Sequence, residues 1–181
     1  MLHITVPASE FYDESKEEFV EIKEQTLTME HSLISISKWE AKWKKPYLSD
    51  DKKTAEELLD YFRCMTITPS KVDPLVYRSM TPENLQEISD YIQDPMTATT
   101  INSNRRGGKR EVWTSEIIYY YMIAQNIPVE FEKWHINRLI MLIQVCAIKN
   151  NPNQKKMSRS EIAKQNRAIN AARRKKYGTR G

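Results

Sequence analysis

The stretch TSEIIYYYMIAQNIPVEFEKWHINRLIMLIQVCAIKN, residues 114–150, is the most apolar part of the chain and decides its fold. Its pattern predicts two apolar helices joined at residues 126–128, the second of which runs to about Lys149. Within Leu139–Ile148 only Gln144 interrupts the apolar run. Because a helix that is apolar on nearly all sides avoids water, other parts of the chain or a partner must enclose it. The stretch holds no catalytic or metal motif, so it indicates a scaffold.

Further helices are predicted around this stretch from their start and stop signals. Glu30–Lys45 has apolar residues at helical spacing and ends before a proline, which disfavours helix in the residue that precedes it. Thr54–Glu57 is a capping box, in which the threonine hydroxyl and the glutamate carboxylate each accept a backbone N–H. Thr81–Glu83 begins a helix that extends to about residue 93, with proline at the first helical position. The side chains expected to form the buried face after Thr54 are Leu58, Leu59, Phe62 and Met65.

Two short hairpins are expected as well. Leu2–Pro7 alternates apolar and polar residues, and Phe19–Lys23 is the second strand of an N-terminal β-hairpin with a polar loop between them. Thr97–Ile101 and Arg110–Trp113 are prone to form strands, and Gly107–Gly108 permits the turn between them. The fold class is therefore mainly α (α+β): a compact helical domain, an N-terminal β-hairpin, a second small hairpin near residues 97–113, and a basic C-terminal helical extension.

Charge divides the chain unevenly. The formal net charge is +4 over 181 residues. Residues 149–181 hold 11 Lys and Arg but one acid, Glu161, a net of +10, so the preceding 148 residues carry −6. We therefore predict a core domain over residues 1–150 and a basic extension over residues 151–181, which is typical of an interaction segment. Its only strong apolar residues, Ile162 and Ile169, are seven positions apart, so we expect it to order mainly against a partner.

The sequence gives no sign of an enzyme, and we expect no metal and no cofactor. His3, His31 and His135 are scattered, and Cys64 and Cys146 lack the spacing of zinc ligands. Both cysteines lie in apolar helical contexts, which indicates buried thiols in a reducing cytosol. No signal peptide and no membrane-spanning run is apparent, so we expect a soluble intracellular protein without membrane partners.

Candidate partner-binding residues fall into three groups. Three consecutive tyrosines cover more than half the circumference of a helix, so at least one of Tyr119, Tyr120 and Tyr121 should face outward. The basic extension supplies a second group, and the glycine-rich turn supplies possible phosphate or acidic-partner contacts. An acidic protein surface is the preferred partner of the basic extension, ahead of nucleic acid and of a role in solubility alone. The basic candidates are Lys155, Lys156, Arg159, Arg167, Arg173, Arg174, Lys175 and Lys176 in the extension, and Arg105, Arg106, Lys109 and Arg110 in the turn.

Several stretches resemble a family of small proteins from tailed bacteriophages. They are LTMEHSLISISKWEAKWKKPYLS, YFRCMTIT, DPMTATT, residues 114–146 and the ending ARRKKYGTRG, which together span nearly the whole chain. These proteins are associated with the tail-assembly region and with tail assembly chaperones. The resemblance implies a non-enzymatic factor that binds the tape-measure or tail-tube protein in the host cytoplasm. It transfers no functional residues.

Two alternatives stay open at this point. The chain could be a permanent virion component of the neck or tail. In that setting it could also form a homo-oligomer. It could instead be a nucleic-acid-binding phage factor that uses the basic extension and the turn at Arg105–Arg110.

Overall fold

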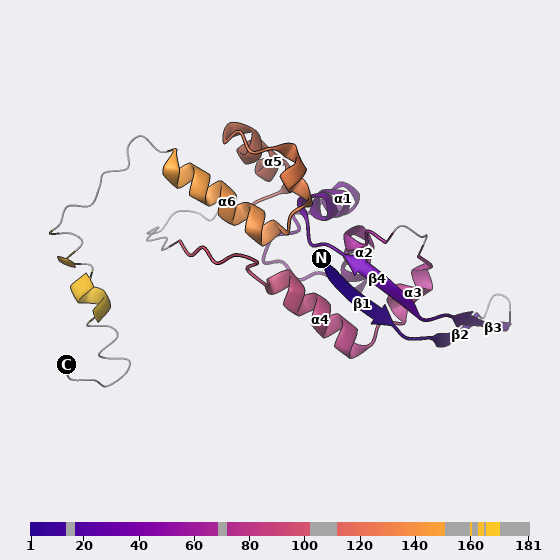
Figure 1. The fold of residues 1–181 in the computed structure, drawn as a ribbon. Helices are drawn as coiled ribbons and strands as arrows, with labels where there is room; N and C mark the ends of the chain where they lie inside the picture. The colour runs from indigo at the N-terminus through magenta and orange to yellow at the C-terminus, as the bar shows by residue number, and fades with distance from the viewer. Residues whose placement is uncertain are drawn as a thin grey trace. The chain divides into compact units, whose positions relative to one another are not determined.

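The computed structural model describes residues 1–13, 17–68, 72–101, 112–150, 160, 163–164 and 166–170. The chain divides into two compact units, Met1–Ala147 and Ile148–Gly181, with the division in the last turn of a helix. The first unit is mainly helical and carries two antiparallel strand pairs, which confirms the predicted α+β class. Figure 1 shows the helices of this unit beside the strands near the N-terminus.

Four short strands form the N-terminal part of the first unit. β1 (Leu2–Val6) pairs with β4 (Gln25–Met29), and β2 (Ser9–Asp13) pairs with β3 (Glu18–Ile22). The two pairs follow one another, so that β2 and β3 extend away from the helices (Figure 1). The predicted pairing of residues 2–7 with residues 19–23 is therefore wrong, because each segment has another partner.

Burial explains this register. Ile4 lies opposite Leu27 in the β1–β4 pair. Both side chains are buried, as are Val6 and Met29, so one face of the pair contributes to the core. Because a shift of one residue would turn this apolar face toward water, the pattern holds the pairing in place. From Thr26 to Met29, β4 alternates polar and apolar residues as β1 does, a signal that the sequence prediction left unused.

The first two helices begin at capping boxes. α1 (Leu33–Trp43) starts after Ser32, whose side chain accepts from Ser35 N while the Ser35 hydroxyl accepts from Ser32 N. α1 ends at Lys44, which has a left-handed backbone with φ 56°. α2 (Ala55–Met65) starts after the predicted cap at Thr54 and packs against α1. The helix predicted for Glu30–Lys45 is thus confirmed, but it begins three residues later.

The buried face of α2 differs from the expected one. Phe62 and Met65 are buried as predicted, but Leu58 is 39% exposed and Tyr61 takes a fully buried position. Glu57 and Asp60 also lie on the buried side, where Lys45 and Lys42 of the α1 region pair with them. Because of these ion pairs, two carboxylates can lie at the α1–α2 contact. With Glu57 and Asp60 on the buried side of α2, Leu58 faces solvent.

Two more helices complete the central part of the unit. α3 (Pro74–Arg78) was not predicted and packs against α2. α4 (Pro82–Gln93) begins at the predicted Thr81 cap and packs against β1, where Asn84 Nδ2 donates to Thr5 O at 3.2 Å. Ile88 and Tyr91 are its buried apolar side chains.

The decisive stretch forms α5 (Ser115–Ala124), a 3-10 helix η1 (Val129–Lys133) and α6 (Ile136–Lys149). The helix predicted to run from residue 128 to Lys149 is therefore wrong in its first part. Trp134 is extended, with ψ 158°, and it separates η1 from α6. The largest fully buried side chains of the core are Trp39, Tyr61, Ile4, Leu27, Met29, Leu33, Ile36, Met65, Ile88, Ile118, Ile136 and Leu139.

The second predicted hairpin is not found in the described residues. Residues 97–101 and 112–113 form no strand, and the turn between them, with Arg105, Arg106, Lys109 and Arg110, lies outside the described residues. In the second unit, residues 160, 163–164 and 166–170 are helical, which agrees with the helix predicted there. The capping box predicted at Ser158–Glu161 and the segment after residue 170 also lie outside the described residues.

Candidate interaction surfaces

α5 presents an apolar face to solvent. Its N-cap, Thr114, accepts from Ile117 N at 3.5 Å, and Ile118 and Met122 point into the core. On the opposite face Tyr120 is 63% exposed and Ile123 is 76% exposed. Isolated exposed apolar residues are normal, but two large ones three positions apart on one helix form a ridge that a partner can contact.

The three tyrosines of α5 have different environments. Tyr120 is the exposed one, whereas Tyr119 is half-buried and its hydroxyl donates to Glu132 Oε2 at 2.8 Å. Burial, together with the Glu132 carboxylate, raises the pKa of Tyr119 to about 12. Tyr121 is half-buried and stacks on Trp113 with 5.2 Å between ring centroids. Tyr119 and Tyr121 thus hold α5 in place, and Tyr120 is the tyrosine that faces outward.

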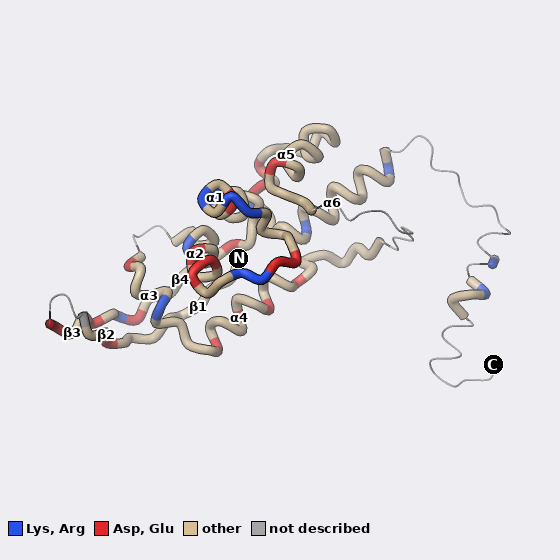
Figure 2. The backbone as a smooth tube through the Cα atoms, turned by 180° about the vertical axis from the view of Figure 1, so that it is seen from behind, with Lys and Arg blue, Asp and Glu red and all other residues tan. Residues whose placement is uncertain are grey.

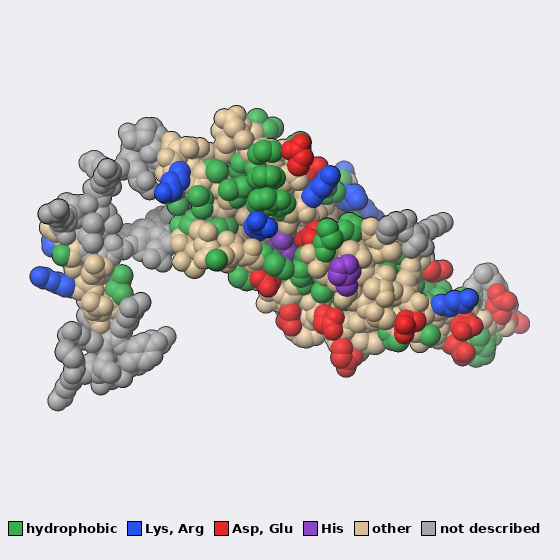
Figure 3. Space-filling view, viewed as in Figure 1, with side chains coloured by type: hydrophobic (Ala, Val, Ile, Leu, Met, Phe, Trp, Pro, Cys, Tyr) green, Lys and Arg blue, Asp and Glu red, His purple; other side chains and the backbone are tan. Residues whose placement is uncertain are grey.

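α6 is only partly enclosed. Within its apolar run, Leu139 and Ile143 are buried, whereas Met141 and Val145 are only partly buried and are not among the side chains packed against the core cluster. These two residues are four positions apart and so lie on one side of the helix. Figure 3 shows hydrophobic side chains gathered over α5 and α6. We call Tyr120, Ile123, Met141 and Val145 the α5/α6 apolar surface.

A buried carboxylate ties α5 to α1. Glu40 is 7% exposed and accepts from Tyr47 N at 2.8 Å through Oε1. Its Oε2 accepts from Ser115 N at 2.7 Å and from the Ser115 hydroxyl at 2.5 Å. Because Tyr47 follows α1 and Ser115 is the first residue of α5, this one side chain fixes where α5 begins relative to α1.

A histidine pair ties α6 to the same region. Ile136 N donates to His31 O at 2.7 Å, and the rings of His31 and His135 lie 5.0 Å apart. His31 Nδ1 is hydrogen-bonded to the Tyr61 hydroxyl. His135 Nε2 donates to Tyr91 O at 2.9 Å while its Nδ1 accepts from a backbone N–H at 3.3 Å, so this ring is neutral.

Burial keeps both histidines uncharged. It lowers the pKa of His31 to about 3, with a smaller contribution from the neighbouring His135. Burial also lowers the pKa of His135, although the hydrogen bond to Tyr91 opposes that change. A charge in this cluster would lie away from water, so neutral rings are the stable form. The cluster therefore acts as a structural support for α5 and α6.

The structure places few of the predicted basic residues. Arg167 lies on the helical part of the second unit and is exposed. The others predicted there lie outside the described residues: Lys155, Lys156, Arg159, Arg173, Arg174, Lys175 and Lys176. Their grouping is thus known from the sequence alone.

Sequence reasoning missed an exposed acidic face on β2 and β3. The register places Glu10 opposite Glu21 and Tyr12 opposite Phe19. Tyr12 is 53% exposed and Phe19 is 72% exposed, and their ring centroids are 5.2 Å apart. An acidic and an aromatic residue two positions apart on each side of a polar loop, Glu10 with Tyr12 and Glu21 with Phe19, form the signal that could have found this face.

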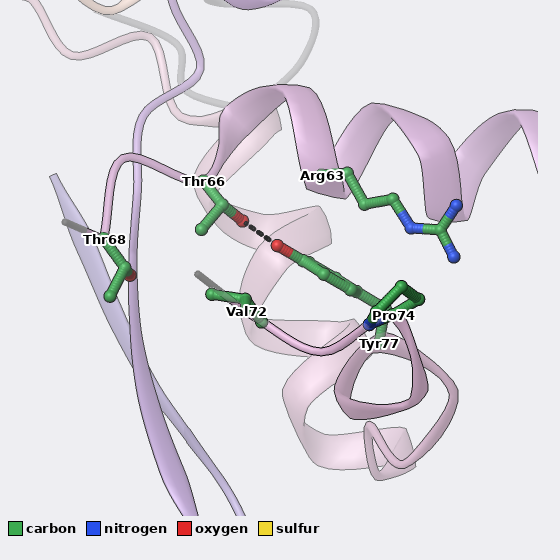
Figure 4. A pocket seen from close by; sticks show the side chains of 6 residues that line it. All are labelled: Arg63, Thr66, Thr68, Val72, Pro74 and Tyr77. Carbon is green, nitrogen blue, oxygen red and sulfur yellow. Dashed lines mark hydrogen bonds between the residues drawn. The ribbon is translucent and has the colours of Figure 1, made fainter. Parts of the chain in front are cut away.

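A pocket between α2 and α3 offers little for ligand binding. It has a volume of about 250 Å³ and is shown in Figure 4. The Tyr77 hydroxyl donates to Thr66 Oγ1 at 3.0 Å, and Thr68 Oγ1 accepts from Thr28 N at 2.9 Å. Arg63 lies over the Tyr77 ring, 5.6 Å from its centroid. Since the hydroxyls already bond within the protein, the pocket has few polar groups free to hold a ligand.

Two features of the described residues bear on metal binding and on thiol chemistry. In the described ranges, His, Cys, Asp and Glu nowhere form a group of three or more that could hold a metal ion. Burial raises the pKa of the Cys64 thiol, which makes it a poorer nucleophile. Among the described helices, none has the length and apolar character needed to cross a membrane. Comparisons with protein-family models, curated proteins and solved structures found no match to this chain.

Proposed function

We propose that this chain is a non-enzymatic binding protein that receives an apolar helical segment of another protein on the α5/α6 apolar surface. The supporting observation is the incomplete enclosure of α6. Its apolar run is the densest in the chain, yet Met141 and Val145 stay only partly buried and outside the core cluster. Covering such residues is favourable, at roughly 25 cal/mol per Å² of apolar area removed from water.

A helix is the partner element that suits this surface. Tyr120 and Ile123 are three positions apart on α5, and Met141 and Val145 are four positions apart on α6. Ridges at these spacings accept the side chains of a packed helix. The resemblance to tailed-phage tail proteins supplies the candidate partner. We propose a tail assembly chaperone role, in which the bound helix belongs to the tape-measure protein or to the tail-tube protein.

Co-expression with the tape-measure protein of the same phage tests this role. The client is expected to be soluble and to co-purify only when the present chain is expressed with it. A client that is equally soluble alone contradicts the proposal. Mass spectrometry of purified virions separates the chaperone role from a permanent neck or tail component, since only the component is found there at stoichiometric amounts.

Two substitutions connect the role to the surface. Ile123→Asp and Val145→Asp place a charge on the α5/α6 apolar surface and should reduce the recovered client by about tenfold or more, because an unpaired charge would be desolvated on binding. Leu85→Asp on α4 is the matched control, since Leu85 is also an exposed apolar residue, at 41%. Circular dichroism of each variant verifies that the fold is kept. Equal loss of client with Leu85→Asp would locate the binding elsewhere.

A further inference from the structure

The negative charge of this protein is concentrated in β2, β3 and their flanks. Residues 9–24, here called the acidic ribbon, contain seven acids and two bases, a net of −5. Residues 149–181, here called the basic segment, carry +10. All other residues together hold 15 bases and 16 acids, a net of −1. The chain therefore has one negative and one positive pole, and Figure 2 shows Asp and Glu on β2 and β3.

One face of the acidic ribbon combines carboxylates with aromatic rings. Alternate residues of a strand share a face, so Glu10 and Tyr12 of β2 lie on the same side as Phe19 and Glu21 of β3. All four side chains are exposed. Carboxylates accept hydrogen bonds from guanidinium groups, and the faces of aromatic rings attract cations. This face has the chemistry that binds arginine and lysine.

The same face is unfavourable when it is unoccupied. Glu10 lies directly opposite Glu21 on this face. Like charges in directly opposed positions destabilise a strand pair. Within the described part of the chain, no basic side chain lies within salt-bridge distance of Glu10 or Glu21. A cationic partner would remove this repulsion.

We propose that the exposed face of the acidic ribbon binds the basic segment of a second copy of this chain, through Arg173–Lys176. This run is the densest group of bases in the chain. Within the first unit, the end of α6 that leads to the basic segment lies opposite the acidic ribbon (Figures 1 and 2). A neighbouring copy therefore offers this acidic face a cationic segment of complementary charge.

Contacts of this kind join copies head to tail. Each copy has one acidic ribbon and one basic segment, and each can engage a different neighbour. Such a contact produces open chains or closed rings, in contrast to a two-fold dimer, which stops at two copies. The inference is independent of the α5/α6 apolar surface, since it uses none of its residues.

Two full-length variants and their mixture test the proposal. Glu10→Gln with Glu21→Gln neutralises the acidic ribbon, and the replacement of Arg173, Arg174, Lys175 and Lys176 by serine neutralises the basic segment. Glu56→Gln with Glu87→Gln is the control for the first variant, because it removes the same charge from exposed positions on α2 and α4. Analytical ultracentrifugation gives the mass of each sample, and circular dichroism verifies each fold.

The wild type and the control should grow in mass with concentration beyond a dimer, and the growth should disappear between about 0.05 M and 0.5 M salt as exposed charges become screened. Each variant alone should associate at least about tenfold more weakly, a loss of about 1.4 kcal/mol. The mixture of the two variants should form a 1:1 complex and stop there, because only one intact ribbon and one intact segment remain.

Three results would overturn the proposal. If the wild type stays monomeric at low salt, the acidic ribbon and the basic segment do not join separate copies. The same result is expected if the basic segment binds the ribbon of its own copy. A mixture that forms no 1:1 complex would exclude ribbon–segment pairing. If the ribbon variant still associates while the segment variant does not, the basic segment binds another surface.

The substitution Phe19→Ser tests the contribution of the aromatic rings on the acidic ribbon. It should weaken association although all the charges of the ribbon are intact.

Discussion

Replacement of Glu40 by glutamine should destabilise the protein strongly although it changes the side chain by a single group. The Glu40 carboxylate is 7% exposed and accepts from two backbone N–H groups, those of Tyr47 and Ser115, and from the Ser115 hydroxyl. A glutamine has one accepting oxygen, so in either orientation its NH₂ group faces one of these backbone donors. One buried N–H then loses its partner.

The magnitude follows from these contacts. A buried donor without a partner costs about 1–3 kcal/mol, and the hydrogen bonds that stay lose the strengthening from a charged acceptor. We expect the free energy of unfolding to fall by about 2–4 kcal/mol, which corresponds to a melting temperature lower by roughly 5–15 °C. Ser115→Ala removes the hydroxyl but keeps the backbone donor, so it should cost less, about 1–2 kcal/mol.

Urea denaturation followed by far-UV circular dichroism measures both variants and their combination. The double variant should cost less than the sum of the single ones, because both substitutions affect the same hydrogen bond. Glu56→Gln, at an exposed position on α2, is the control and should change the stability by less than about 0.5 kcal/mol. If Glu40→Gln is as stable as this control, the three hydrogen bonds do not hold α5 to α1 as described.

Three further predictions concern the supports of the fold. Burial lowers the pKa of His31 from 6.5 to about 3, so as the pH falls the unfolded chain takes up a proton on this residue before the folded chain does. On account of His31, the free energy of unfolding should therefore decrease by about 1–2 kcal/mol between pH 7 and pH 5. His31→Asn should flatten the pH dependence of the urea midpoint in this window, and an unchanged slope would contradict a neutral buried ring. Thr54→Ala should lower the stability by about 1 kcal/mol, because it removes the hydroxyl that accepts from Glu57 N, 3.2 Å away. Thermal denaturation should show that Thr54→Ser, which keeps a hydroxyl, retains the stability of the wild type. Trp39→Phe removes the donor to Glu57 O, 2.8 Å away, and part of a fully buried ring. Calorimetry should therefore show a free energy of unfolding lower by about 2–4 kcal/mol. A decrease under about 1 kcal/mol would mean that the core adapts to the smaller side chain.

Local signals in the sequence located the starts of α2 and α4 correctly. The cap at Thr54 and the cap at Thr81 need only the four residues that form them, so tertiary structure did not have to be known. Strand partners were harder, because β1 pairs with β4 across a second strand pair and nothing local to residues 2–6 specifies that choice. The break at Trp134 depends on the contact of Ile136 N with His31 O, more than 100 positions earlier in the chain.

The candidate surfaces were predictable to different degrees. Spacing showed that one of the α5 tyrosines faces outward, but only the fold shows that Tyr120 does so while Tyr119 bonds to Glu132. The exposure of Met141 and Val145 was not predictable, since it depends on how far the other helices reach around α6. The acidic face required the register of β2 and β3, for which the matched spacing of acidic and aromatic residues on either side of the polar loop is a local signal that the sequence prediction left unused.

The opposed carboxylates of β2 and β3 also bear on aggregation. In the described residues this strand pair has no third strand, so its outer edges offer backbone groups to any extended chain, which is a common route to uncontrolled sheet growth. A second ribbon added alongside would bring its own Glu10, Glu18 and Glu21 next to the same acidic residues. Like-to-like growth is therefore opposed by electrostatic repulsion, and this protection should weaken at high salt, where the charges are screened.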